Sequence, residues 1–350
     1  MHPPEYQRLR AQLAANPRRW LVTGAAGFIG SNLVEELLAL GQFVVGLDNF
    51  STGFRANIDE VLTNRASSAD RFTLIEGDIR DAECCRAACA GVDHVLHQAA
   101  LASVPRSIED PAGSHGVNVD GFFNMLCAAK DAGVRRFVYA SSSAVYGDAR
   151  EQPQREERTG RSLSPYAAQK AINESYATAF QLTYGIETVG LRYYNIFGPR
   201  QDPEGAYAAV LPRWVTNLIE ERPCVVYGDG ETTRDFCYVA NVVQANLLAS
   251  LVRDPVATGQ AYNVASAQSV TLNYLFALIS SSVSALTGCA EATPSYQPFR
   301  AGDIRHSSGS IERARRLLGY SPTHDVCAGL AEVLPWYLSH RTALETARAE

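Results

Sequence analysis

The 350-residue sequence has no apolar run long enough to cross a lipid bilayer, so we expect no membrane insertion. Its first 19 residues carry arginines but no apolar central stretch, unlike a secretory signal peptide. It also lacks an excess of positive charge. The 37 Asp and Glu against 31 Lys and Arg give a net charge of −6, which argues against a nucleic-acid partner. These absences predict a cytoplasmic protein.

Metal-binding cysteine spacing is missing as well. None of the eight cysteines forms a C-x-x-C pair, and no cluster of His and Cys has zinc spacing. We therefore predict no metal site. Free thiols in a reducing compartment are the expected state of these cysteines.

What the sequence does contain is an alternation of short β-rich apolar runs with helical patterns. Such alternation predicts an α/β fold: a doubly wound parallel sheet (Rossmann) with a smaller mixed α/β domain. The runs expected to be strands are 20–23, 43–47, 72–76, 94–97, 136–140, 187–191 and, returning to the sheet, 260–265.

The change of texture after residue 191 predicts two domains, each built from separate segments. The nucleotide-binding domain is expected to comprise 18–191 plus 236–265, and the smaller domain 192–235 plus 266–340. Residues 1–17 form an N-terminal extension, in which we expect a short amphipathic helix.

A serine run and a Tyr-x-x-x-Lys pair predict chemistry on an alcohol. Tyr166 and Lys170 are four residues apart on an expected helix and therefore share a face. A lysine ammonium beside a phenol favours the phenolate, which makes Tyr166 a candidate base near neutral pH. A hydroxyl from the run Ser141-Ser142-Ser143 would hold the substrate oxygen whose proton leaves. This trio is typical of an enzyme that oxidises an alcohol to a ketone.

A glycine turn predicts the hydride acceptor. Gly24, Gly27 and Gly30 follow the first expected strand and open a helix, where glycine lets the backbone approach a pyrophosphate. The N-terminus of that helix favours the negative phosphates. Asp48 ends the second strand, about twenty positions later, where a carboxylate suits the ribose hydroxyls of NAD. NAD is therefore the predicted cofactor, since a carboxylate there would repel the additional phosphate of NADP.

Further cofactor contacts are expected in the same helix turn and where the next strands end. Together with Tyr166 and Lys170, they are Phe28 and Ile29 in the turn, Asn49 beside Asp48, Asp78 and Ile79 on the adenine side, and Gln98, Ala99 and Ala100 on the pyrophosphate and nicotinamide side.

Eight further segments support a family resemblance that spans Trp20 to about Tyr337. They are Leu47-Asp-Asn-Phe50, His97-Gln-Ala-Ala-Leu101, Ser103-Val-Pro-Arg-Ser107, Gln201-Asp-Pro, Gly205-Ala-Tyr-Ala-Ala-Val210, Gly228-Asp-Gly-Glu231, Arg234-Asp-Phe-Cys-Tyr238 and Pro335-Trp-Tyr337. With the motifs above, the sequence resembles the extended short-chain dehydrogenase/reductase family. Within it, the resemblance is to nucleotide-sugar 4-epimerases, closest to bacterial UDP-N-acetylglucosamine 4-epimerases.

The resemblance implies roles for individual residues. Tyr166 corresponds to the base, Lys170 to the residue that binds the nicotinamide ribose, and Ser142 to the catalytic hydroxyl, with Ser143 beside it. The implied substrate contacts are Ser103, Ser142, Asn195, Ala209, the uracil neighbours Val226 and Tyr227, the pyrophosphate clamps Arg234 and Arg300, the uridine-ribose ligand Asp303, and Ser307, whose small size leaves room for an N-acetyl group. From the residues alone, a turn cap at Asn195, strand core at Val226 and surface ion pairs at the arginines stay open alternatives.

The implied activity is reversible C4 epimerisation of a UDP-hexose. The substrate expected is UDP-GlcNAc, giving UDP-GalNAc, with UDP-Glc and UDP-Gal as a further pair, for the supply of cell-surface polysaccharide precursors. The implied partner is a second copy of the chain, paired through the helices at 120–132 and 167–183. Two departures concern the sugar pocket: Ala102 stands where these relatives have glycine, and Ala144 where they have a third serine.

Three other functions are alternatives for a sequence of this kind. A UDP-glucuronate or N-acetylated uronate 4-epimerase is the main alternative. A sugar-nucleotide 4,6-dehydratase is disfavoured because Ser143 and Ala144, rather than an Asp-Glu pair, follow Ser142. A non-catalytic NAD-binding scaffold is disfavoured because Tyr166 and Lys170 are both retained.

Overall fold

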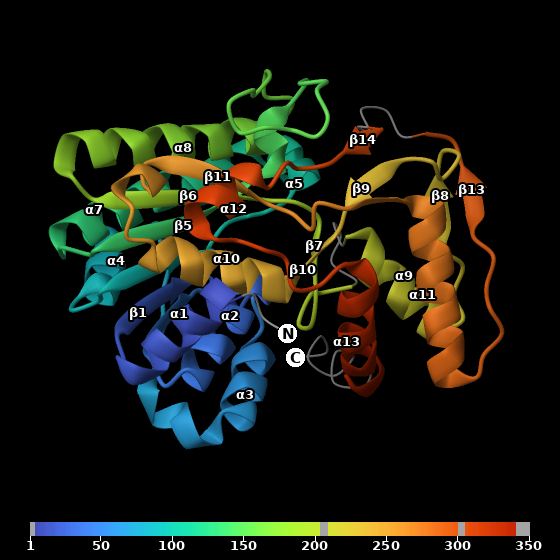
Figure 1. Ribbon diagram of the computed structural model, residues 1–350, viewed down its shortest axis with the longest axis horizontal. Helices are drawn as coiled ribbons and strands as arrows, with labels where there is room; N and C mark the ends of the chain where they lie inside the picture. The colour runs from blue at the N-terminus through green and yellow to red at the C-terminus, as the bar shows by residue number, and fades with distance from the viewer. Residues whose placement is uncertain (1–3, 204–208, 300–304, 341–350) are drawn as a thin grey trace.

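A seven-stranded parallel sheet forms the centre of the computed structural model, which describes residues 4–203, 209–299 and 305–340 (Figure 1). Its strand order is β11-β6-β5-β4-β1-β2-β3, the doubly wound arrangement, and all seven predicted strands are present. In chain order they are β1 (Arg19–Thr23), β2 (Phe43–Asp48), β3 (Phe72–Glu76), β4 (His94–His97), β5 (Arg136–Ser142), β6 (Glu187–Tyr193) and β11 (Gln260–Val264). The predicted fold class is confirmed.

Helices cover both faces of this sheet. Neighbouring strand residues alternate between two apolar cores: Val22 contributes to one, with residues of α1, α2, α3 and α10, and Leu21 to the other, with residues of α4, α7 and α8 (Figure 1). The first set comprises α1 (Pro4–Ala15), α2 (Phe28–Ala39), α3 (Arg55–Asn64) and α10 (Val239–Leu251), and the second α4 (Ala82–Cys89), α7 (Phe122–Asp131) and α8 (Pro165–Tyr184). Between β4 and α7 lie α5 (Val104–Glu109), α6 (Pro111–His115) and a π-helical segment (Gly116–Gly121).

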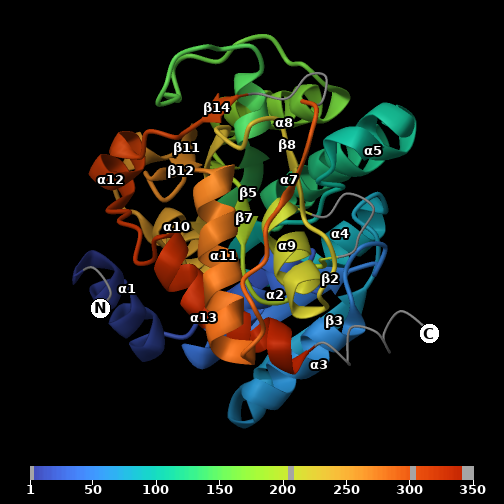
Figure 2. The same ribbon diagram turned by 90° about the vertical axis from the view of Figure 1, so that its right-hand side faces the viewer.

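A third apolar core lies beside the sheet, around α9 (Val210–Ile219), α11 (Leu272–Thr287) and α13 (Val326–Ser339), which Figure 2 shows together. Short strand pairs border it. These pairs are β7 (Ile196–Phe197) with β10 (Cys237–Tyr238), β8 (Val225–Tyr227) with β13 (Ser295–Gln297), and β9 (Thr233–Asp235) with both β12 (Ser269–Thr271) and β14 (His306–Ser307). The helix α12 (Glu312–Leu318) follows β14. The division into two domains at the boundaries given above stays a prediction.

The sequence predicts a loop over 293–308, but this stretch is not irregular throughout. It contains β13 and β14, which pair with β8 and β9 in parallel register. Each of these strands has at most three residues, and each partner lies more than sixty positions away in sequence. No local pattern can predict pairing of this kind.

The N-terminal extension forms the expected helix, α1. Hydrogen bonds of Gln42, the residue before β2, connect this helix to the sheet. The fully buried Gln42 side chain donates from Nε2 to the carbonyl oxygen of Leu13 (2.9 Å). Its Oε1 accepts from the Arg18 amide (3.0 Å) and from Nε1 of Trp20 (3.2 Å). Within the described ranges, no helix is both long and apolar enough to cross a membrane.

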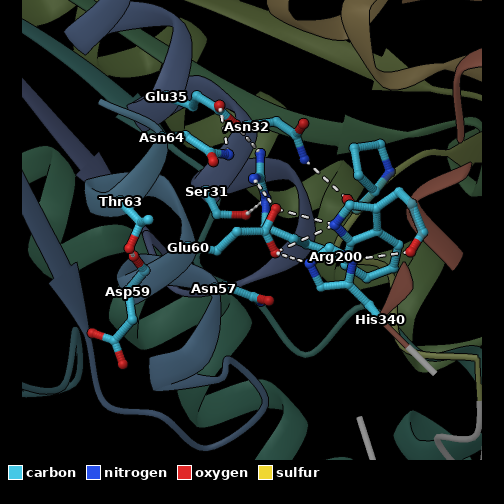
Figure 3. A network of polar contacts seen from close by, with 12 residues as sticks. Ser31, Asn32, Glu35, Asn57, Asp59, Glu60, Thr63, Asn64, Arg200 and His340 are labelled. Atoms are coloured by element: carbon cyan, nitrogen blue, oxygen red, sulfur yellow. Dashed lines mark hydrogen bonds and ion pairs between the residues drawn. The ribbon is translucent and has the colours of Figure 1, made fainter. Parts of the chain in front are cut away.

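A polar network connects the helices beside β1 with the segment that follows β7 (Figure 3). Arg200 donates to Glu35 Oε2 of α2 (2.6 Å), to Glu60 Oε1 of α3 (3.1 Å) and to Ser31 Oγ (3.1 Å). Trp336 of α13 also donates from Nε1 to Glu60 Oε1 (3.0 Å). Two carboxylates of the sheet-covering helices thus hold both the loop after β7 and the C-terminal helix.

Candidate active site

The glycine turn after β1 has the geometry of a phosphate-binding turn. Gly24 has φ +66°, which favours glycine, and its amide donates to the carbonyl oxygen of Leu47 (2.8 Å). A Cβ on Gly30 would lie 1.9 Å from the Gly24 carbonyl oxygen. Gly27 is the N-cap residue of α2 and has no side chain to cap it. The first amides of α2 are therefore left for an anion.

Asp48 lies directly beside this turn at the end of β2. Its Oδ2 accepts from the Ala26 amide (2.9 Å) and its Oδ1 from the Phe50 amide (2.8 Å). Burial raises the pKa of Asp48, and these backbone amides lower it. The amides fix the orientation of the carboxylate, and its remaining lone pairs stay available for hydroxyl donors. Its role as a ribose ligand stays a prediction.

Asn49 and Asp78 lie together at the ends of β2 and β3, as the adenine-side prediction requires. Nδ2 of Asn49 donates to Asp78 Oδ2 (2.7 Å). The same carboxylate accepts from Nε of Arg80 (3.0 Å), and hydrogen bonds from Arg80 are the main reason that the pKa of Asp78 falls to about 2. The sequence did not predict this arginine partner. The side chain of Ile79 is buried in the core under α4 and α7, so it shapes this edge by packing.

Gln98 follows β4 and belongs to a closed hydrogen-bond triangle. Its Oε1 accepts from the Tyr193 hydroxyl (3.0 Å), and its Nε2 donates to Asn246 Oδ1 (3.1 Å). Nδ2 of Asn246 in turn donates to the Tyr193 hydroxyl (2.9 Å). Nearby, the Ala99 amide donates to Thr23 Oγ1 (3.2 Å). Gln98, Ala99 and the following Ala100 thus lie between β4 and β1, where the strand order reverses and ligands of such sheets bind.

Tyr166 and Lys170 lie buried on one face of α8. Nζ of Lys170 donates to the carbonyl oxygen of Ala140 in β5 (2.8 Å) and lies 5.9 Å from the centre of the Tyr166 ring. Burial lowers the pKa of Lys170 to about 8, while Glu174 raises it. Burial raises the pKa of Tyr166, and a hydrogen bond with Ser142 lowers it. Our expectation that Lys170 makes Tyr166 a base near neutral pH is therefore not met by these side chains alone.

The three serines at the end of β5 have separate partners. Ser141 Oγ donates to Glu174 Oε1 (2.5 Å), away from Tyr166. Ser142 Oγ accepts from the Ala144 amide (3.1 Å) and is the serine that meets Tyr166. Ser143 is half-buried and begins a short 3₁₀ helix (Ser143–Tyr146). The geometry therefore favours Ser142 as the hydroxyl beside the phenol.

Three predicted substrate contacts from distant segments of the chain come together outside the central sheet. They are Asn195, Arg234 and Ser307. Nδ2 of Asn195 donates to the carbonyl oxygen of Asp235 (3.0 Å), next to Arg234. Arg234 pairs with Ser307 in the β9–β14 register, and its Nη1 donates to the Thr233 carbonyl oxygen (2.8 Å). Arg300 and Asp303, the other predicted diphosphate and ribose ligands, lie outside the described residues.

The remaining predicted substrate contacts have structural positions of their own. Val226 is fully buried in the core around α9 and α11, so any ligand contact there would involve its main chain, whereas Tyr227 is half-buried. Ala209 is exposed at the N-cap of α9. Ser103 is the N-cap residue of α5 and accepts from the Arg106 amide (3.1 Å). The ligand roles of these four residues stay predictions.

Two side chains that the sequence reading missed complete the surroundings of the predicted catalytic residues. Glu174 is paired with Arg192, whose Nη2 lies 2.7 Å from Glu174 Oε2. Glu174 is four residues after Lys170 and eight after Tyr166, so helical spacing places all three on one face. Extending the Tyr-x-x-x-Lys pattern by one turn would have found it.

Known proteins share the sequence pattern and the fold of this chain. Residues 20–265 match the sequence model of the NAD dependent epimerase/dehydratase family. The UDP-glucose 4-epimerase of Mycolicibacterium smegmatis is 36% identical over 321 residues, which cover 91% of this chain and 98% of that protein. Two solved structures are similar. The UDP-N-acetylglucosamine 4-epimerase of Methanobrevibacter ruminantium, in complex with UDP-N-acetylmuramic acid, has 35% identity and a TM-score of 0.84 over 93% of this chain and 99% of that chain. The UDP-glucose 4-epimerase of Thermus thermophilus, in complex with NAD, has 33% identity and a TM-score of 0.78 over 91% and 99%.

Proposed function

The chain belongs to the NAD-dependent epimerase/dehydratase family, and from that premise we propose that it interconverts the C4 epimers of a UDP-hexose. The proposed pair is UDP-GlcNAc and UDP-GalNAc, with UDP-Glc and UDP-Gal as a second pair. The observation that carries the proposal is the placement of the buried Tyr166 and Lys170 on one face of α8, where Lys170 Nζ donates to the carbonyl oxygen of Ala140, two residues before Ser142, with no carboxylate in the two positions after Ser142. Such a site exchanges a proton with an alcohol and has no evident partner for eliminating water.

NAD is the cofactor of the family, and the residues present fit it. A Cβ on Gly24 would lie 2.8 Å from the Ala99 amide nitrogen, and one on Gly30 would lie 1.9 Å from the Gly24 carbonyl oxygen. The turn that presents the first amides of α2 to a pyrophosphate can therefore form only with glycine at these positions. When bound, NAD supplies the hydride acceptor, and the positive charge of its oxidised ring favours the Tyr166 phenolate.

The chain's own residues then handle the proton and the substrate. Tyr166 takes the proton from the 4-hydroxyl, and Ser142 holds the same oxygen by a hydrogen bond. Lys170 contributes positive charge beside the phenol. The resulting 4-keto sugar has to present its other face before reduction, while its diphosphate stays bound. Arg234, the middle residue of β9, is the described cation that we assign to the diphosphate. Return of the hydride to the opposite face of C4 and of the proton from Tyr166 restores the alcohol, so that no net oxidation occurs.

Two observations support UDP-GlcNAc as the substrate. The M. ruminantium structure is of a UDP-N-acetylglucosamine 4-epimerase, and Ser307 is a small residue beside Arg234. The M. smegmatis relative supports the plain hexose pair. A uronate substrate is the alternative, and it would require a cation or hydroxyl at the C6 carboxylate. We place the activity in the cytoplasm, in the supply of polysaccharide precursors.

We also propose a homodimer. The outer faces of α7 and α8 expose large apolar side chains: Phe123 is 38% exposed, Tyr176 39% and Leu182 82%. The Phe123 and Tyr176 rings lie 5.2 Å apart and make a continuous patch across the two helices. A second copy of these helices would cover it as a four-helix bundle. Sedimentation of the protein and of Leu182→Glu tests this, because one added charge should produce monomers.

The proposed activity is tested by incubating the purified protein separately with UDP-GlcNAc, UDP-Glc and UDP-GlcA. Anomeric proton signals in NMR spectra show which substrate gains its C4 epimer. We expect UDP-GalNAc from UDP-GlcNAc. Accumulation of a 4-keto-6-deoxy product would establish a dehydratase instead, and epimerisation of UDP-GlcA alone would establish the uronate alternative. If no product forms, the remaining alternative is a non-catalytic NAD-binding scaffold.

A further inference from the structure

We propose that Glu174, together with Arg192, is a positioning residue that holds the helix bearing Tyr166 and Lys170 against the end of the strand bearing Ser142. The proposal rests on the proposed function, because Tyr166 and Ser142 are its proton-handling residues. Neither Glu174 nor Arg192 is assigned contact with the sugar or the cofactor.

Both oxygens of the Glu174 carboxylate accept hydrogen bonds. Oε1 accepts from Ser141 Oγ (2.5 Å) and from Nε of Arg192 (2.9 Å), and Oε2 accepts from Nη2 of Arg192 (2.7 Å). The Arg192 side chain is 6% exposed and that of Glu174 17%. A bidentate pair in such a site has one geometry and is costly to break.

These contacts tie two successive turns of α8 to two successive residues of β5. Lys170 donates from Nζ to the Ala140 carbonyl oxygen (2.8 Å), and one turn later Glu174 binds the Ser141 side chain. Ser142 is the next residue of β5. A shift of α8 along the strand would break both contacts at once, so together they fix the distance between Ser142 and Tyr166.

Arg192 extends the attachment to the rest of the sheet end. It lies opposite Ser141 in the β5–β6 register, and its Nη1 donates to the Tyr146 hydroxyl (3.0 Å) and to the Glu156 carbonyl oxygen (3.1 Å). The Tyr146 hydroxyl donates onward to Asn263 Oδ1 in β11 (2.6 Å). Glu174 therefore joins α8 to a network that spans β5, β6 and β11.

Glu174 also affects the charge of Lys170. It raises the pKa of Lys170 against the lowering caused by burial. Removing the carboxylate would lower that pKa further and leave the Arg192 charge uncompensated nearby, so less of the lysine would be protonated at neutral pH. The titratable and charged groups around this lysine and glutamate are His97 of β4, whose pKa burial lowers to about 3, Tyr139 of β5, Arg192 of β6, and Tyr166 of α8.

The test is Glu174→Gln, which keeps the size of the side chain and removes its charge. We expect kcat to fall at least about tenfold, since an ångström of misplacement costs up to about a hundredfold, while KM changes less than about twofold. We also expect the alkaline limb of the pH profile to move to lower pH. A loss of stability alone would reduce the amount of active enzyme without moving this profile.

The chain offers a matched control at the other end of the same two strands. Arg136 of β5 pairs with Glu187 of β6 (2.6 Å), is 7% exposed, and also donates to the carbonyl oxygens of Ala249 and Val252. Glu187→Gln likewise leaves a buried arginine without its carboxylate. We expect it to lower stability but to keep the wild-type kcat per folded molecule and the wild-type pH profile.

A second variant and a measurement without turnover keep the proposal testable if Glu174→Gln does not fold. Ser141→Ala removes the bond to β5 but keeps the ion pair, and we expect kcat to fall about threefold. The Tyr166 phenolate is titrated by ultraviolet absorbance, as the difference between each variant with and without Tyr166→Phe. Its apparent pKa should rise in Glu174→Gln and stay unchanged in Glu187→Gln.

Wild-type kcat and pH profile in Glu174→Gln, or equal changes in Glu187→Gln, would overturn the proposal. If the wild-type protein converts no UDP-sugar, the proposed function fails instead, and the phenolate titration alone decides whether Glu174 acts on the tyrosine and lysine.

Discussion

A Cβ atom on Gly30 would lie 1.9 Å from the carbonyl oxygen of Gly24, so the first turn of α2 rests directly on the turn after β1. Backbone atoms cannot move aside as a flexible side chain can. We therefore expect Gly30→Ala to lower the free energy of unfolding by about 2 kcal/mol, despite the higher helix propensity of alanine. NAD affinity should fall at least about tenfold, because the amides at the start of α2 would shift.

Denaturant unfolding and titration with NAD measure the two effects of Gly30→Ala. Gly116→Ala is the control, because Gly116 has helical φ of −56° and its added Cβ would meet only Cδ of Arg80 at 3.8 Å. It should leave stability and NAD affinity close to wild type. Equal NAD affinity in Gly30→Ala and the wild type would contradict the role that we give this turn.

Tyr166→Phe should abolish most epimerisation while keeping the protein folded. The substitution removes one hydroxyl and keeps the buried ring, so packing on α8 is kept. Loss of a positioned acid or base costs about a hundredfold to ten-thousandfold in kcat. Turnover of UDP-GlcNAc followed by NMR gives the rate, and bound NAD per protein checks that the cofactor site is intact. A variant with the wild-type rate would exclude Tyr166 as the base.

The central sheet could be predicted from sequence because each strand contains residues for two cores. Leu21 and Val22 point to opposite faces, and the same alternation recurs in the neighbouring strands. The pairs β8–β13 and β9–β14 could not be predicted from sequence, because strands of two or three residues have no periodicity and their partners are distant in sequence. From residue types, the sequence predicted that the glycine turn and Asp48 lie at the same edge of the sheet, and the structure has them side by side there.

The candidate site was predictable as a set of residues but not in its hydrogen bonding. Three consecutive serines are chemically alike, and only the strand geometry directs Ser141 to Glu174 and Ser142 to Tyr166. The pKa of a phenol depends on its burial, which no local pattern at Tyr166 and Lys170 reveals. The same holds for Arg80, whose contact with Asp78 depends on the conformation of the loop after β3.

Lys170 should make stability depend on alkaline pH. Its pKa is about 8 in the folded protein and 10.5 as a free side chain, so between these values the unfolded chain binds more protons. Stability therefore rises with pH in this window, and the cost of burying the charged lysine is fully present below pH 8. The cost is about 3 kcal/mol from the difference in pKa.

Comparison with Lys170→Met isolates this contribution from other groups that titrate at high pH. We expect the free energy of unfolding of the wild type, measured without added NAD, to increase relative to Lys170→Met as pH rises through the window. The variant should also lose activity, because the charge beside Tyr166 is gone. Parallel pH curves for the two proteins would show that Lys170 keeps its ordinary pKa.

The network around Arg200 predicts a coupling between stability and substrate binding (Figure 3). Arg200 has φ +66°, and its buried side chain binds Glu35 and Glu60, each about one-fifth exposed. Arg200→Met would leave these carboxylates without their main partner. If both glutamates were fully buried, the substitution would lower the free energy of unfolding by about 3–5 kcal/mol. Because both are partly exposed, we expect a loss of about 2 kcal/mol.

The same variant should raise the KM for the UDP-sugar more than it lowers kcat. Arg200 fixes the segment that follows β7, and β7 begins directly after Asn195, a predicted substrate contact, while Tyr166, Lys170 and Ser142 lie on other elements. Arg10→Met is the control: Arg10 pairs with Glu36, the neighbour of Glu35 on α2, and none of its contacts among the described residues is with the segment after β7. Urea unfolding and initial rates at varied UDP-GlcNAc should show a small loss of stability and an unchanged KM for this control. An unchanged KM in Arg200→Met as well would mean that the network stabilises the fold without acting on the substrate side.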